Sequence, residues 1–87
     1  MDKIICNFDL FGVSNVYISS VGNQTQYFTQ IATSAEGLGR LIADLSASKG
    51  IPNIHLFGSE AYAHGIIEQI FANNNCYAKS DIKIEVN

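Results

Sequence analysis

Two acidic residues lie where predicted strands end, and carboxylates at such positions can do chemistry. Asp9 follows an apolar stretch that begins near Lys3, and Glu60 follows one that ends at Phe57. Carboxylate oxygens are the ligands that Mg²⁺ prefers, and parallel strands gather their carboxyl ends at one edge of a sheet. If the two strands are parallel neighbours, Asp9 and Glu60 lie at the same edge of the sheet and are candidates for a site there. The alternative is a turn-capping Asp9 and a Glu60 in the first turn of a helix, where the helix dipole favours an acid.

The other reactive side chains form no recognisable constellation. Glu60 and His64 have an i, i+4 spacing that can hold a metal, but no third ligand accompanies them. His55 lies inside a predicted strand, where a half-buried, hydrogen-bonded imidazole is expected. Cys6 and Cys76 lack metal-type spacing, and no basic neighbour indicates a lowered thiol pKa at Cys6. We therefore expect no metal and no cofactor.

The first third of the chain has the alternation of β-strands. Residues 3–10 place Ile4, Cys6 and Phe8 on one face, and residues 13–21 are rich in β-branched and aromatic types. Gly22-Asn23 suits a two-residue hairpin turn, and residues 24–32 form the third predicted strand. These patterns predict a three-stranded antiparallel meander.

The middle of the chain changes to helical periodicity. Thr33 followed by Glu36 predicts a capping box, and Gly50 with Pro52 predicts the end of that helix. Its apolar stripe consists of Leu38, Leu41, Ile42 and Leu45. Gly37 and Gly39 weaken this helix, which indicates a close approach to the sheet.

The last third repeats a strand and a helix and ends in a strand. Residues 53–57 form a short apolar strand, and residues 79–86 alternate as a half-exposed edge strand. Between them lies a second helical stripe, Ala63, Ile66, Ile67 and Ile70, which ends near Asn73.

The element order is thus β-β-β-α-β-α-β within one domain, residues 1–87. Right-handed parallel crossovers make the first strand the neighbour of the fourth. The predicted fold is α/β, with a mixed five-stranded sheet in the order 3-2-1-4-5 and two helices.

That order is similar to the core of the ribonuclease H-like and actin-like superfamily. The hairpin around Asp9 and Gly12 resembles the first hairpin of these proteins, in which an acid ends strand one and a glycine turn follows. The resemblance implies a ribonuclease H-like fold. It also implies a minimal Mg²⁺-dependent nuclease, with Asp9 and Glu60 as its candidate catalytic residues. In overall style the chain also resembles small bacteriophage proteins.

The composition indicates which binding partners and which cellular compartment to expect. The chain has 5 Lys plus Arg against 8 Asp plus Glu, for a net charge of −3. Its few cations are scattered, so direct nucleic-acid binding is not expected. No stretch has the length of a membrane span or of a signal peptide, and the expected location is the cytoplasm.

One long run carries no charge. Between Leu10 and Ala35, 26 consecutive residues include no Asp, Glu, Lys or Arg. Exposed sheet edges usually carry charges that discourage pairing with another sheet, so this run indicates a covered surface. The predicted interface residues are Tyr17, Gln26, Tyr27 and Phe28. We expect an accessory protein that acts by protein–protein contact, as a homodimer or with a host or viral partner, rather than an enzyme. The alternative remains the minimal nuclease.

Overall fold

The computed structural model describes residues 2–8, 14–20, 22–29, 34–72 and 82–87, and for residues 23–29 it describes the backbone alone. Five strands and two helices lie in these ranges. In chain order they are β1 (Lys3–Phe8), β2 (Ser14–Ser20), β3 (Asn23–Thr29), α1 (Ala35–Lys49), β4 (Asn53–Phe57), α2 (Glu60–Ala72) and β5 (Lys83–Val86).

The sheet is mixed and centres on β1. The strands with described side chains follow the order β2-β1-β4-β5, with β1 antiparallel to β2 and parallel to β4, and β4 parallel to β5. On the backbone, β3 pairs antiparallel with the outer edge of β2, so that the complete order is β3-β2-β1-β4-β5. The α/β class, the two helices and the parallel pairing of β1 with β4 are confirmed.

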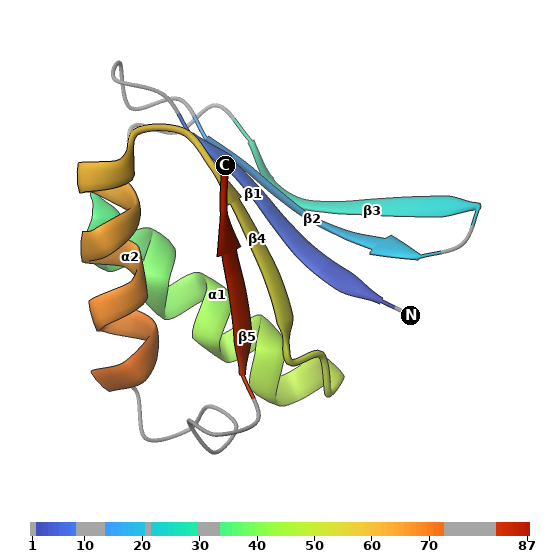
Figure 1. Ribbon diagram of the computed structural model, residues 1–87. Helices are drawn as coiled ribbons and strands as arrows, with labels where there is room; N and C mark the ends of the chain where they lie inside the picture. Colours follow the sequence, from blue (N-terminus) through green and yellow to red (C-terminus); the bar gives the residue numbers. More distant parts are fainter. Residues whose placement is uncertain (1, 9–13, 21, 30–33, 73–81) are drawn as a thin grey trace.

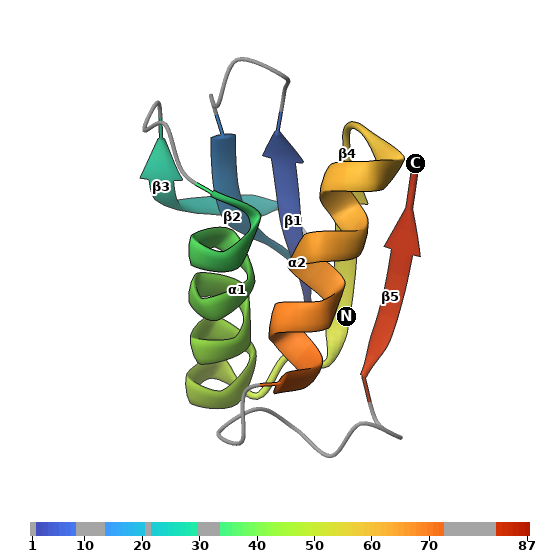
Figure 2. The same ribbon diagram turned by 90° about the vertical axis from the view of Figure 1, so that its left-hand side faces the viewer.

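Both described helices lie on the same side of the sheet (Figures 1 and 2). The strands turn alternate side chains toward this layer, as the two-residue period of a strand requires. The covered face of the sheet consists of Ile4, Cys6, Phe8, Val16, Ile54 and Leu56, all buried. They pack against the helical stripes, including Leu38, Ile42, Ile66 and Ile70, in one core. The result is a two-layer α/β fold.

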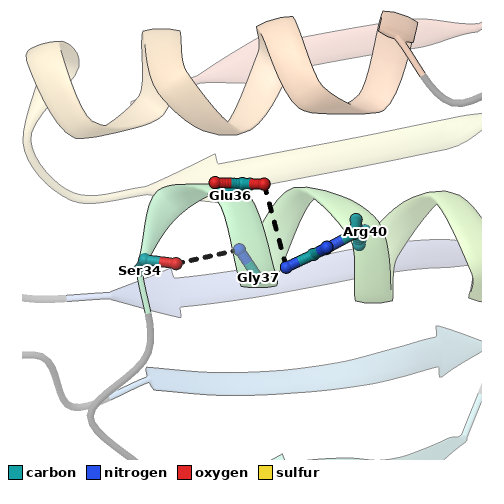
Figure 3. Close-up of polar contacts among 4 residues, drawn as sticks. All are labelled: Ser34, Glu36, Gly37 and Arg40. Carbon is teal, nitrogen blue, oxygen red and sulfur yellow. Dashed lines mark hydrogen bonds and ion pairs between the residues drawn. The ribbon is translucent and has the colours of Figure 1, made fainter.

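The start of α1 differs from the predicted capping box. The N-cap is Ser34, whose Oγ accepts a hydrogen bond of 3.1 Å from the backbone N–H of Gly37 (Figure 3). Glu36 instead reaches Arg40 one turn later, at 3.9 Å (Figure 3). The prediction was one residue early because Thr33 and Ser34 are both good caps. Thr33 itself lies outside the described residues.

The end of α1 follows the prediction. Gly50 adopts a left-handed conformation with φ of 70° and caps the helix. Ser46, fully buried in the last turn, donates its hydroxyl to the carbonyl of Ile51 at 2.7 Å. The chain thereby reverses and enters β4.

The glycines of α1 were expected to approach the sheet, and this prediction was wrong for Gly39. A side chain at Gly39 would meet the other helix, with a Cβ 2.5 Å from Cβ of Gln69 and 2.8 Å from the carbonyl oxygen of Ile66. A Cβ on Gly65 of α2 would in turn lie 2.9 Å from Cβ of Ala35. These two glycines let the helices pack closely side by side over the sheet.

Several predicted boundaries shift or lie outside the described ranges. The predicted strands 3–10, 13–21 and 24–32 extend into residues that are not described, as does the end of the second helix near Asn73. Within the described part, Ile82 precedes β5 rather than belonging to it. None of the described helices is long and apolar enough to cross a membrane.

Candidate functional site

The second face of the sheet is covered by neither of the two described helices (Figure 1). Alternation and register assign it the residues between those of the covered face. We call it the open face, and it consists of Lys3, Ile5, Asn7, Asn15, Tyr17, Ser19, Asn53, His55, Phe57, Lys83 and Glu85. Apolar, aromatic and charged side chains are mixed here.

One row crosses the middle of the open face. Backbone register places Tyr17 beside Ile5, Ile5 beside His55, and His55 beside Glu85. Tyr17, Ile5 and His55 are half-buried, whereas Glu85 is exposed. Neighbouring side chains cover part of each ring and aliphatic group, and the remainder faces away from the helices.

A polar contact closes this row at β5. Nε2 of His55 lies 2.9 Å from Oε2 of Glu85, with 20% and 70% of the two side chains exposed. The His55 ring also lies 5.9 Å from the Phe57 ring, tilted by 60°. The expectation of a half-buried, hydrogen-bonded His55 is confirmed. The pair is ionic only when the imidazole is protonated, and its exposure keeps its contribution small.

The predicted interface residues fall in the β2–β3 half of the sheet. Tyr17 lies on the open face. In the register of β3, Gln26 lies opposite Tyr17 and Phe28 lies opposite Val16, with an irregularity between Val16 and Tyr17. For Gln26, Tyr27 and Phe28 only the strand backbone is described, so their side chains lie outside the described structure.

The two edges of the sheet differ in charge. β3, at one edge, is Asn-Gln-Thr-Gln-Tyr-Phe-Thr and has no charged residue. β5, at the other edge, is shorter and presents Lys83 and Glu85, both exposed. Edge charges of this kind oppose pairing with a foreign strand. β3 lacks that protection.

Of the two candidate catalytic acids, only Glu60 lies within the described residues. Glu60 begins α2 and is exposed, as expected for an acid in the first turn. Asp9 lies outside the described residues. His64 is exposed on α2, and the described ranges contain no group of three metal-binding side chains.

The thiol of Cys6 lies in the core. Cys6 is 0% exposed, and burial raises the pKa of its thiol to about 12, because the thiolate would lose its hydration. Burial, and then the charge of Cys6, raise the pKa of Tyr62, whose ring lies 5.1 Å from Phe8. The expectation that Cys6 is not activated is confirmed, and Cys76 lies outside the described residues.

Reasoning from the sequence did not identify Ile5 and Phe57 as members of a surface. Ile5 occupies a position where the alternation of β1 calls for a polar residue, and Phe57 follows His55 by one strand period. Such apolar residues on the polar face of two strands could have marked the open face. The register of the parallel pairing between β1 and β4 places Ile5 beside His55 and Phe57 beside Asn7, and this register comes from the structure.

Comparison with known proteins adds no family assignment. No protein-family model matches the chain, and no curated protein matches it in sequence.

Proposed function

We propose that this protein acts by protein–protein contact and associates with a second copy of itself. The observation that carries the proposal is the position of the 26-residue run without charge. It includes β2 and β3, and the joined ends of these strands extend away from the helices (Figure 1). An uncharged strand pair at the rim of a sheet is suited to contact with another protein.

Net charge favours this half of the molecule for self-association. Each copy carries a charge of −3, so two copies repel one another at long range. Contact through a surface without ionised groups places no like charges at short distance. A small domain also gains stability when it buries part of its surface against a copy of itself.

The mass in solution tests the proposal. Size-exclusion chromatography with light scattering at micromolar concentration is expected to give twice the chain mass of 9.5 kDa, falling toward 9.5 kDa on dilution. A mass of 9.5 kDa at every concentration would refute self-association.

The second candidate is a minimal ribonuclease H-like, Mg²⁺-dependent nuclease. It is favoured by the parallel pairing of β1 and β4, in which Asn7 lies opposite Phe57 so that both strands end at one edge. Asp9 follows β1 closely in sequence, and Glu60 follows β4. Carboxylates at this edge would hold Mg²⁺ and polarise a phosphodiester.

Cleavage assays separate the two candidates. The nuclease predicts Mg²⁺-dependent cutting of an RNA–DNA hybrid or branched DNA that is lost in Asp9→Asn. Intact substrate with either Mg²⁺ or Mn²⁺ would reject it and leave the contact proposal standing.

A further inference from the structure

We infer that the contact between copies is a backbone pairing of β3 with β3 of the second copy, which joins two sheets into one. The inference rests on the proposed self-association and assigns it a surface. Within the described sheet, β3 pairs with β2 along one side and with no strand along the other. A strand in this position presents a row of backbone N–H and C=O groups to a further strand.

The length of β3 suits this role. It has seven residues, against four in β5 at the opposite edge. A longer edge offers more backbone hydrogen bonds to a partner strand. Self-pairing about a two-fold axis uses the same seven residues twice. Where a residue of one copy lies opposite a certain residue of the other, the same two positions also pair the other way round.

Charge favours a second copy as the occupant. In an isologous contact, a charged residue near the two-fold axis meets its own duplicate, and two like-charged residues of the edge can be brought opposite each other. β3 has none, so its self-pairing meets no such repulsion in any register. At β5, by contrast, the exposed Lys83 and Glu85 would have to be paired or desolvated.

The pairing determines the shape of the dimer. Antiparallel neighbours are related by a two-fold axis perpendicular to the sheet, which keeps like faces on the same side. The helices of both copies would therefore lie on one side of a continuous sheet, since α1 and α2 lie on one side within each copy (Figure 2). The two open faces would join into one surface on the other side.

Paired charge variants of β3 test the inference. We expect Gln24→Lys/Gln26→Lys to weaken the dimer at least about tenfold, because like charges are juxtaposed across the edge. The matched control Ala47→Lys/Ala72→Lys adds the same charge at exposed helix positions and should retain the dimer mass. Gln24→Glu/Gln26→Glu should weaken the dimer in the same way as the lysine variant.

Mixing the two β3 variants distinguishes a broken contact from a broken fold. The lysine and glutamate variants, each monomeric alone, should form a mixed dimer, since opposite charges then face each other. If both variants keep the wild-type dimer, the β3 pairing is overturned while self-association stands. If two monomeric variants fail to form a mixed dimer, the β3 pairing is likewise overturned. A monomeric wild-type protein overturns both proposals.

Discussion

The two faces of the sheet are built from the same strands but differ in how deeply their side chains are buried. On the covered face, five side chains from β1, β2 and β4 are 0% exposed: Ile4, Cys6, Val16, Ile54 and Leu56. On the open face, the alternate positions of those strands hold residues such as Lys3, Asn7 and Tyr17, none of them fully buried. Adjacent residues of one strand thus have opposite environments.

This difference separates stability from surface chemistry. Burial of aliphatic groups beneath the helices supplies most of the favourable free energy of folding. The open face contributes less, so its residues can change with little loss of fold. Substitutions at neighbouring positions on the two faces measure how complete this separation is.

Thiol chemistry should give the largest contrast. The comparison uses two variants in a Cys76→Ser background. The first keeps Cys6 as its single cysteine. The second carries Ile5→Cys and Cys6→Ala, so that its single cysteine lies at the neighbouring position on the open face. At pH 8 the Cys6 thiol should react with a disulfide reagent about 1,000-fold more slowly, since its pKa is about 12 rather than 9.0 and it is buried. Similar rates for the two thiols would show that the covered face opens readily.

The raised pKa of Cys6 also makes stability depend on pH. The thiol has a higher pKa in the folded protein, about 12, than the ordinary value of 9.0. Its contribution is therefore complete below pH 9 and is lost as the pH rises toward 12. Cys6→Ala should flatten this alkaline loss in urea-unfolding experiments, and an unchanged pH profile would contradict the assignment.

Matched isoleucines on β1 should give the next largest effect. Ile4→Ala removes a fully buried side chain from the covered face and should lower the free energy of unfolding by about 2–5 kcal/mol. Ile5→Ala, one residue later on the open face, should cost about 1 kcal/mol. Urea denaturation measures both, and equal losses would mean that the open face is also part of a core.

Close packing of the helices over the covered face predicts an intermediate effect. Gly39→Ala would place its Cβ 2.5 Å from that of Gln69, and overpacking costs about 1–3 kcal/mol. The better helix propensity of Ala returns about 1 kcal/mol. A net loss is expected, whereas Ser48→Ala, at an exposed position of the same helix, should be neutral or slightly stabilising. A Gly39→Ala protein more stable than the wild type would contradict the close approach.

The smallest effect is expected on the open face. Glu85→Gln removes the carboxylate beside His55, and an exposed pair of this kind contributes about 0–1 kcal/mol. Lys83→Gln on the same strand serves as the control. A decrease of more than about 2 kcal/mol in the free energy of unfolding for Glu85→Gln would mean that the contact with His55 holds β5 in place.

Local sequence patterns predicted much of the fold. The spacing of Leu38, Ile42 and Leu45 predicted α1, and Gly50 predicted its end, because a helical stripe and a left-handed cap depend on nearby residues. The cap at the start of α1 was less determinate, since two adjacent hydroxyl residues satisfy the same rule. The patterns also placed Tyr17 in the second strand and Glu60 in the first turn of a helix, where the structure has them, whereas Asp9 lies outside the described residues.

By itself the sequence determined which residues are apolar, how they alternate and where charge is missing, because these are properties of the chain. Only the tertiary structure decided that both helices pack on one face, that Gly39 meets α2 rather than the sheet, and that Ile5 lies beside His55. Such choices depend on contacts between segments far apart in the chain. Alternation assigns two faces to a strand, but which face is covered depends on where the helices dock.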